Sequence, residues 1–126
     1  NYLKDILDVF KERSETLNDL IAYTKIVLNE ENIVIDDDVA NIIKNTNLRV
    51  KQKIIESLES INIWNLENIE KAIKNLLISL NIKLPQIALP IRVALLGKKY
   101  SPSIYIILLL IGKNQSLKRI KKAFCN

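Results

Sequence analysis

Residues 65–81, NLENIEKAIKNLLISLN, hold the clearest helical pattern in the chain. Their apolar side chains recur every three or four residues, which places them on one face of an α-helix. Asn65 can act as the N-cap, Glu67 complements the positive end of the helix dipole, and Asn81 marks the end of the pattern. The apolar positions that predict this amphipathic helix are Leu66, Ile69, Ile73, Leu76, Leu77 and Leu80.

Helical spacing continues on the N-terminal side of this segment. Thr16 and Asp19 have the spacing of a capping box, and we expect a helix break or kink close to Arg13. Three consecutive acids starting at Asp36 suit the N-terminus of a short helix that runs to about Asn45. The expected helices cover residues 3–10, 17–28, 36–45 and 48–61, with a loop over 29–35.

On the C-terminal side, glycines and prolines divide the chain into further short helices. The stretch from Pro85 to Pro90 predicts the boundary of a helix over 91–96 that ends at Gly97. Ser101 and Pro102 resemble an N-cap followed by proline at the first helical position. The last two expected helices run from there to Gly112, and from an Asn114 or Ser116 cap to about Phe124.

The fold class is therefore predicted to be all-α, because no segment alternates with the period of two that a half-buried strand requires. About seven helices are expected, and a chain of this length fits either one compact domain or two small helical lobes. Trp64 is expected to pack as a hydrophobic anchor ahead of a helix.

The composition excludes several classes of protein. The 126 residues are 48% hydrophobic, which is too apolar for intrinsic disorder, and a single cysteine rules out a disulfide framework. Histidine is absent, so the commonest general base at neutral pH is missing and we expect no catalysis by this segment. The longest apolar run, residues 104–111, is too short for a membrane span. We expect a cytoplasmic protein, and a piece of a longer chain.

Charge divides the chain into an acidic and a basic half. Residues 1–63 hold eight Lys or Arg against twelve Asp or Glu, whereas residues 64–126 hold eleven against two. After Glu70 no acidic residue follows. A one-sided positive field of this kind attracts polyanions, so nucleic acid is the leading candidate partner. The acidic clusters match no calcium-loop spacing, and we predict no metal site.

The segment LPIRVALLGKKYSP, residues 89–102, carries the most specific signal for function. Arg92 interrupts an apolar helix start, and a guanidinium is rarely buried without a partner. It could pair with a carboxylate or a helix C-terminus, or its planar fork could bind phosphate or unstacked RNA bases. Lys98 and Lys99 follow in a loop that leads to the free N–H groups of a helix expected near Ser101.

Four pieces of sequence together carry a resemblance to a known family. They are ERSETL at 12–17, WNLENIE at 64–70, PIRVALLG at 90–97 with Ser101-Pro102, and LIGK at 110–113 with Arg119-Ile120. In this combination the chain resembles the C-terminal anticodon-binding region of bacterial-type glutamyl-tRNA synthetases, over essentially all its residues. The resemblance implies the all-helical anticodon-binding domain of a class I aminoacyl-tRNA synthetase. Such a domain is a two-lobed helical bundle, or helical cage, and its lobes would cover residues 1–61 and 62–126 of this chain.

The resemblance also implies a parent enzyme, a glutamate–tRNA ligase, that uses ATP with Mg²⁺ in a catalytic domain outside this segment. The segment itself is expected to hold no cofactor, to bind the anticodon loop of tRNA-Glu, and to act as a monomer without membrane contact. The residues that correspond to anticodon-binding positions are Arg13, Arg92, Lys98, Lys99, Ser101, Pro102 and Ile104. Those expected to contact the tRNA backbone are Lys113, Lys118 and Arg119, although Arg119 could equally hold the last helix in place.

Two other classes of function remain open at the level of the sequence. A helix-turn-helix-like module would use the basic half and the short helices beside Gly97 to bind duplex DNA. A protein-interaction bundle would carry its lysines only for solubility. The first predicts a preference for duplex DNA over an anticodon stem-loop, and the second predicts background nucleic-acid affinity at physiological salt.

Overall fold

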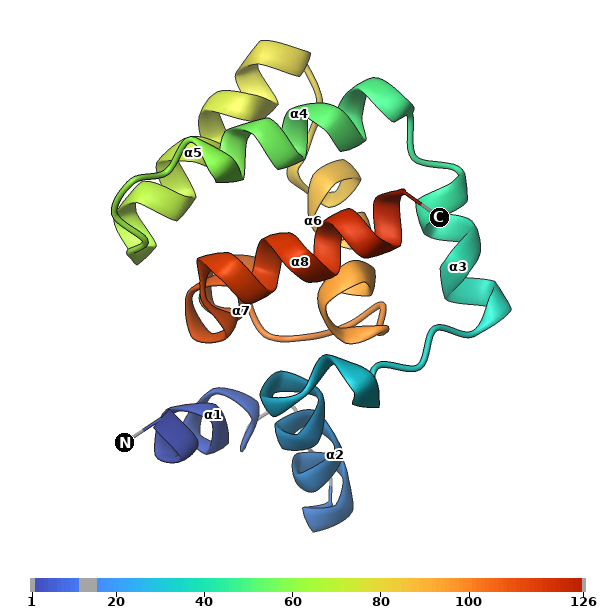
Figure 1. The fold of residues 1–126 in the computed structure, drawn as a ribbon, viewed down its shortest axis with the longest axis vertical. Helices are drawn as coiled ribbons and strands as arrows, with labels where there is room; N and C mark the ends of the chain where they lie inside the picture. The colour runs from blue at the N-terminus through green and yellow to red at the C-terminus, as the bar shows by residue number, and fades with distance from the viewer. Residues whose placement is uncertain (1, 12–15, 126) are drawn as a thin grey trace.

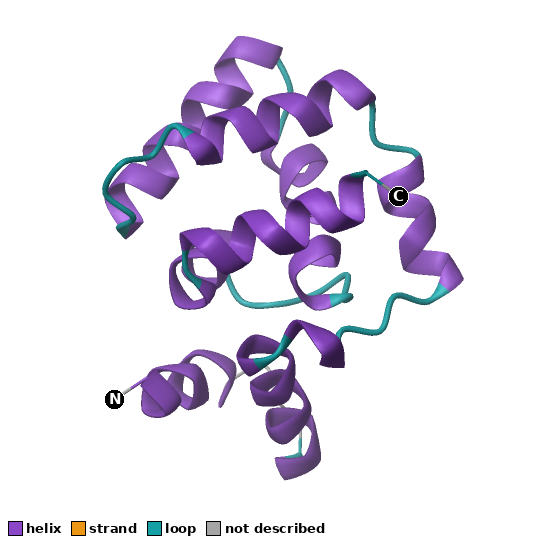
Figure 2. Ribbon diagram, in the orientation of Figure 1, coloured by secondary structure: helices purple, strands orange, loops and turns teal. Residues whose placement is uncertain are grey.

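A computed structural model describes residues 2–11 and 16–125, and these form eight α-helices, one more than the approximate number expected (Figures 1 and 2). The all-α prediction is confirmed, since no strand occurs among the described residues. The helices are α1 (Tyr2–Phe10), α2 (Leu17–Leu28), α3 (Asp37–Lys44), α4 (Leu48–Glu59), α5 (Leu66–Leu80), α6 (Leu84–Leu96), α7 (Ile104–Ile111) and α8 (Lys113–Phe124), with a 3-10 turn at Glu30–Asn32.

Helix α6 is the centre of the hydrophobic core. Most of its side chains are buried, and it packs against α2, α3, α5, α7 and α8. Figure 1 shows α8 crossing in front of α6, with α1 and α2 at one end of the molecule and the paired α4 and α5 at the other. Helix α6 carries Arg92 and leads into the Lys98–Lys99 loop. The most buried helix of the fold therefore positions residues 89–102, the segment with the most specific signal for function.

The predicted helix caps on α2 and α5 are confirmed. The Thr16 hydroxyl accepts a hydrogen bond from the Asp19 N–H at 3.1 Å, and the Asp19 carboxylate accepts one from the Thr16 N–H at 3.3 Å. The Asn65 side chain accepts from the Asn68 N–H at 2.8 Å. Asn81 ends α5 in the left-handed conformation, with φ of 53°.

The prediction of a helix restricted to residues 91–96 is wrong, because α6 begins at Leu84 and continues through Pro90. Pro85 lies in the first turn, where its missing N–H costs nothing. Pro90 lies inside the helix and removes one backbone hydrogen bond, a cost of about 3 kcal/mol. Burial of nearly every side chain from Ile87 to Leu96 offsets that cost, which the local sequence rules do not include.

The start of α8 also differs from the prediction. The helix begins directly at Lys113 with Gly112 as its N-cap, so neither Asn114 nor Ser116 caps it. Gly112 adopts φ of 90°, which lets one residue join α7 to α8. Ser116 is instead buried, and its hydroxyl donates to the Leu108 carbonyl at 3.4 Å.

Helices from both predicted lobes pack against one another. Helix α4, which lies before residue 61, packs mainly on α5 and α8, which lie after it. Buried side chains on all of these helices belong to one hydrophobic cluster. The division at residues 61 and 62 stays a prediction about sequence organisation.

Trp64 is an anchor, as expected, and it also donates a hydrogen bond to the Leu108 carbonyl at 2.9 Å. Trp64→Phe should keep most of the packing and lower the free energy of unfolding by about 0.5–1 kcal/mol, because that carbonyl still accepts from the Gly112 N–H. Urea denaturation should show a lower midpoint at an unchanged m-value. An unchanged midpoint would contradict a stabilising role for this bond.

Candidate nucleic-acid interface

Arg92, on α6, forms hydrogen bonds with the loop between α6 and α7 and so holds that loop against the helix. Its Nε donates to the Ser101 hydroxyl at 2.7 Å, and Nη1 lies 3.4 Å from the Lys99 carbonyl. The side chain is half-buried, so the guanidinium lies at the edge of the protein and not in its dry interior. The structure therefore brings together three of the predicted anticodon-binding residues, Arg92, Lys99 and Ser101.

Ser101 and Pro102 do not begin a helix, which corrects the prediction from the Ser-Pro motif. Helix α7 begins at Ile104, and Ser103 occupies the N-cap position without a side-chain cap bond. Ser101 is buried, and its hydroxyl is satisfied there because it accepts from Arg92 and donates to the Pro102 carbonyl at 2.7 Å. The free helix N–H groups that were expected near Ser101 therefore belong to the start of α7 at Ile104.

The loop itself combines a tight turn with exposed cations. Gly97 ends α6 with φ of 70°, a conformation that glycine adopts without strain. Lys98, Lys99 and Tyr100 then lie on the surface, with Tyr100 78% exposed. Ile104 is buried in the hydrophobic core at the start of α7, a position that does not fit the predicted contact with the anticodon. Two lysines and an exposed aromatic ring can attract phosphate and stack on a base.

The other predicted cations have different surroundings. Arg13 lies outside the described residues. The Lys113 ammonium donates to the Glu59 and Ile61 carbonyls at 3.0 and 2.6 Å, which ties α8 to the end of α4. Lys118 forms an ion pair with Glu30 at 2.8 Å while remaining 62% exposed, and this bond lowers the pKa of the Glu30 carboxyl. Both lysines thus hold structural contacts.

Arg119 lies in the interior, which favours the second of its two predicted roles, that of holding the last helix in place, although its partners are backbone carbonyls. It is only 3% exposed, and its guanidinium donates to the Leu95 and Val27 carbonyls at 3.1 and 3.0 Å. Burial lowers its pKa from the ordinary value, and the nearby Glu30 carboxylate opposes that shift. This position does not fit contact with phosphate. In the sequence Arg119 is one of several basic residues on an amphipathic helix, and only the packing distinguishes it from the surface lysines around it.

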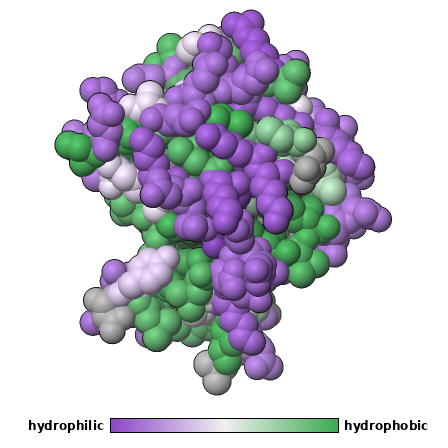
Figure 3. All heavy atoms as spheres, viewed as in Figure 1, coloured by the Kyte–Doolittle hydropathy of each residue, from purple (hydrophilic) through white to green (hydrophobic). Residues whose placement is uncertain are grey.

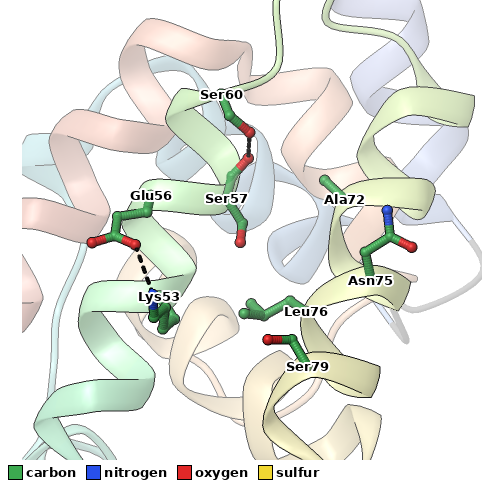
Figure 4. A pocket seen from close by; sticks show the side chains of 8 residues that line it. All are labelled: Lys53, Glu56, Ser57, Ser60, Ala72, Asn75, Leu76 and Ser79. Atoms are coloured by element: carbon green, nitrogen blue, oxygen red, sulfur yellow. Dashed lines mark hydrogen bonds and ion pairs between the residues drawn. The ribbon is translucent and has the colours of Figure 1, made fainter.

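A groove elsewhere on the surface has no excess of positive charge among its lining residues. This groove, of about 370 Å³, lies between α4 and α5, and in it Lys53 pairs with Glu56 at 3.3 Å. Figure 4 shows the side chains that line it. Its charges therefore cancel, and its remaining lining is Ser57, Ser60, Ala72, Asn75, Leu76 and Ser79. In Figure 3, the face with α8 in front is mostly hydrophilic, and hydrophobic atoms gather lower, near α1.

Among residues 2–11 and 16–125, no group of metal-ligating side chains gathers that could hold an ion. Within the same residues, none of the helices has the length and apolar character needed to span a bilayer. The cationic loop after α6 is the best candidate site, because it holds the exposed Lys98, Lys99 and Tyr100 beside Arg92.

The geometry defines a class: an all-helical domain with a cationic loop fastened to its central helix. The sequence model of a family described as the anticodon binding domain matches residues 1–124, and the chain belongs to that family.

Its relatives are glutamate–tRNA ligases. The chain is 31% identical over 121 residues to glutamate–tRNA ligase 2 of Rickettsia akari (strain Hartford), covering 96% of this chain and 26% of that protein. It is 33% identical over 119 residues to glutamate–tRNA ligase of Acidovorax sp. (strain JS42), covering 94% and 25%. The chain thus spans about a quarter of the length of these curated relatives.

A solved structure has the same fold. The crystal structure of a glutamate tRNA ligase from Elizabethkingia meningosepticum, in complex with its amino acid, superposes with a TM-score of 0.80. The alignment covers 96% of this chain and 24% of that one at 21% identity, so it supports the fold.

Proposed function

We propose that this anticodon-binding domain binds the anticodon loop of tRNA-Glu, so that a glutamate–tRNA ligase of which it forms part can attach glutamate to that tRNA. The observation that carries the proposal is the placement of Arg92. Its guanidinium lies at the surface of α6 and is held by Ser101, next to the exposed Lys98 and Lys99. The family membership and the glutamate–tRNA ligase relatives support tRNA as the polyanion.

The proposed division of labour follows from the chemistry of the two cations. A lysine ammonium attracts any phosphate, so Lys98 and Lys99 contribute affinity that is independent of sequence and falls with salt. The planar guanidinium of Arg92 can bind the edge of an unstacked base in a fixed geometry, and thereby contributes discrimination. Tyr100, at 78% exposure, offers a ring on which a splayed base can stack.

The proposal assigns ATP and Mg²⁺ to another part of the ligase, and no cofactor to this chain. We also propose that the protein acts as a monomer in the cytoplasm and that Arg13 is a further contact to the anticodon. Sedimentation of the 126-residue chain with and without tRNA tests the monomeric state, since a free monomer and a 1:1 complex with tRNA are expected.

The experiment that tests the proposal is filter binding of the 126-residue chain to tRNA-Glu transcripts in which each anticodon position is varied in turn. The expected result is a loss of affinity for substitutions within the anticodon and little change for substitutions in the acceptor stem. A duplex DNA of equal length and an unrelated tRNA complete the set. Equal affinity for all of these nucleic acids would refute the proposal.

The double variant Lys98→Ala/Lys99→Ala should weaken binding to every tRNA by the same factor. Each phosphate contact on a single strand contributes about 0.7 to the slope of log K against log salt, so the slope should flatten by roughly 1.4. The anticodon preference should not change. Lys4→Ala/Lys11→Ala is the matched control, because both lysines are exposed on or just after α1 and the charge change is the same. An equal effect in the control would show that only net charge matters.

A further inference from the structure

Arg119 joins the ends of two helices that are distant in sequence. Its Nη1 donates to the Leu95 carbonyl in the last turn of α6, and its Nη2 donates to the Val27 carbonyl in the last turn of α2. The last carbonyls of a helix have no partner within the helix and carry partial negative charge. The Arg119 guanidinium on α8 therefore provides hydrogen-bond donors to one terminal carbonyl of each of two helices.

Two further contacts lie beside this bridge. Lys118, the residue before Arg119, pairs with Glu30 in the turn that follows α2. Gly97, directly after α6, approaches the Val34 backbone so closely that an added Cβ would lie 2.5 Å from the Val34 carbonyl oxygen. The segment after α2 is thus in contact with both α8 and the end of α6.

Apart from the contact of Gly97 with Val34, packing does not fill this junction. A pocket of about 140 Å³ lies between α6, α8 and the segment after α2, lined by Glu30, Ile33, Ile35, Ala94, Arg119, Lys122 and Ala123. Where side chains leave a cavity, apolar contacts permit small shifts, whereas two directed hydrogen bonds from one rigid guanidinium permit few. The fork of Arg119 is therefore the element best able to set the distance between α2 and α6.

We propose that Arg119 is a positioning residue for anticodon discrimination. It holds the C-terminal end of α6, from which the loop with Lys98 and Lys99 leaves and on which Arg92 lies. A shift of that end would move the Arg92 guanidinium away from the base edge it contacts, while the flexible lysines would still reach phosphate. The inference rests on the proposed function. It predicts that Arg119 affects the discrimination between anticodons and leaves the salt-dependent affinity for tRNA unchanged.

The test compares two variants of the 126-residue chain with the unchanged protein. Arg119→Met keeps the length of the side chain without its donors, and Arg119→Lys keeps the cation but lacks the fork that reaches both carbonyls. Ile54→Ala is the control, because Ile54 is fully buried on α4, away from the loop, and its truncation also lowers stability. The Tm of each protein is measured, and filter binding is done below the lowest Tm.

The measured quantity is the ratio of Kd values for tRNA-Glu and for transcripts with a substituted anticodon. Both Arg119 variants are expected to lose about tenfold in this ratio, with an unchanged salt slope, whereas Ile54→Ala should keep the ratio. Arg119→Lys should recover part of the Tm and little of the ratio. Retention of the full ratio in a folded Arg119 variant overturns the inference, as does failure of both variants to fold. If the unchanged protein itself has no anticodon preference, the proposed function is what fails.

Discussion

Gly97→Ala is expected to lower the free energy of unfolding by about 2–5 kcal/mol. Gly97 has φ of 70°, and an alanine in the left-handed region costs about 1–2 kcal/mol. The added Cβ would also lie 2.5 Å from the Val34 carbonyl oxygen and 3.1 Å from Ile33 Cγ2. Because the nearest atom belongs to the backbone, α6 or the segment after α2 must shift, at a further cost of about 1–3 kcal/mol.

Gly112→Ala is a control for backbone strain without a steric contact. Gly112 also has a positive φ, of 90°, but around its added Cβ the described part of the chain leaves at least 4 Å of space. Its ψ of 161° places it in a region that essentially only glycine adopts, so its substitution should cost the conformational part alone, about 1–3 kcal/mol. Urea denaturation measures both losses, and a loss for Gly97→Ala above about 2 kcal/mol exceeds the cost of its left-handed backbone and reports the contact with Val34. A loss of only about 1–2 kcal/mol for Gly97→Ala would mean that this contact relaxes without cost.

Most of the helices could be predicted because their signals are local. The spacing of apolar residues defines the buried face of α5, and the caps at Thr16 and Asn65 mark where α2 and α5 begin. Each signal depends on residues within one or two turns, so it is visible without knowledge of the rest of the fold. The same holds for Gly97 and Gly112, which end α6 and α7.

The errors arose where a distant part of the chain decides the local structure. Pro90 lies inside α6 because burial against five other helices offsets its lost hydrogen bond. Ser101 resembled an N-cap, but its hydroxyl accepts from Arg92, nine residues earlier. Arg119 resembled a surface cation, yet its partners are 24 and 92 residues away. No window of sequence contains those partners, so composition alone could not separate Arg119 from its lysine neighbours.

Within the candidate site, the residue types could be predicted but not their arrangement. The sequence indicated a basic loop after an apolar segment that contains Arg92. The structure adds that Arg92 and Ser101 are bonded and that Lys98 and Lys99 are exposed. It also shows that Lys113 and Lys118 contact the protein itself, which spacing along α8 could not indicate.

Arg92→Lys should abolish most of the anticodon preference while changing overall salt dependence little. Lysine keeps the positive charge but lacks the planar fork, and a good bidentate contact contributes about 1–3 kcal/mol of discrimination. Arg92→Ala should cause the same loss of preference and leave most of the salt slope, because the phosphate contacts are assigned to Lys98 and Lys99. Filter binding of transcripts with each anticodon position varied, at several salt concentrations, measures both quantities.

Arg92 also anchors the loop, so the test must separate anchoring from contact with RNA. Ser101→Ala removes the hydroxyl that accepts from Arg92 Nε at 2.7 Å and leaves the guanidinium in place. If Arg92 acts only as an anchor, Ser101→Ala and Arg92→Lys should reduce the preference by similar factors. If the guanidinium contacts a base, Arg92→Lys should cost clearly more, and the loss should concentrate at one anticodon position. A uniform loss across all positions would instead assign Arg92 to the support of the lysine loop.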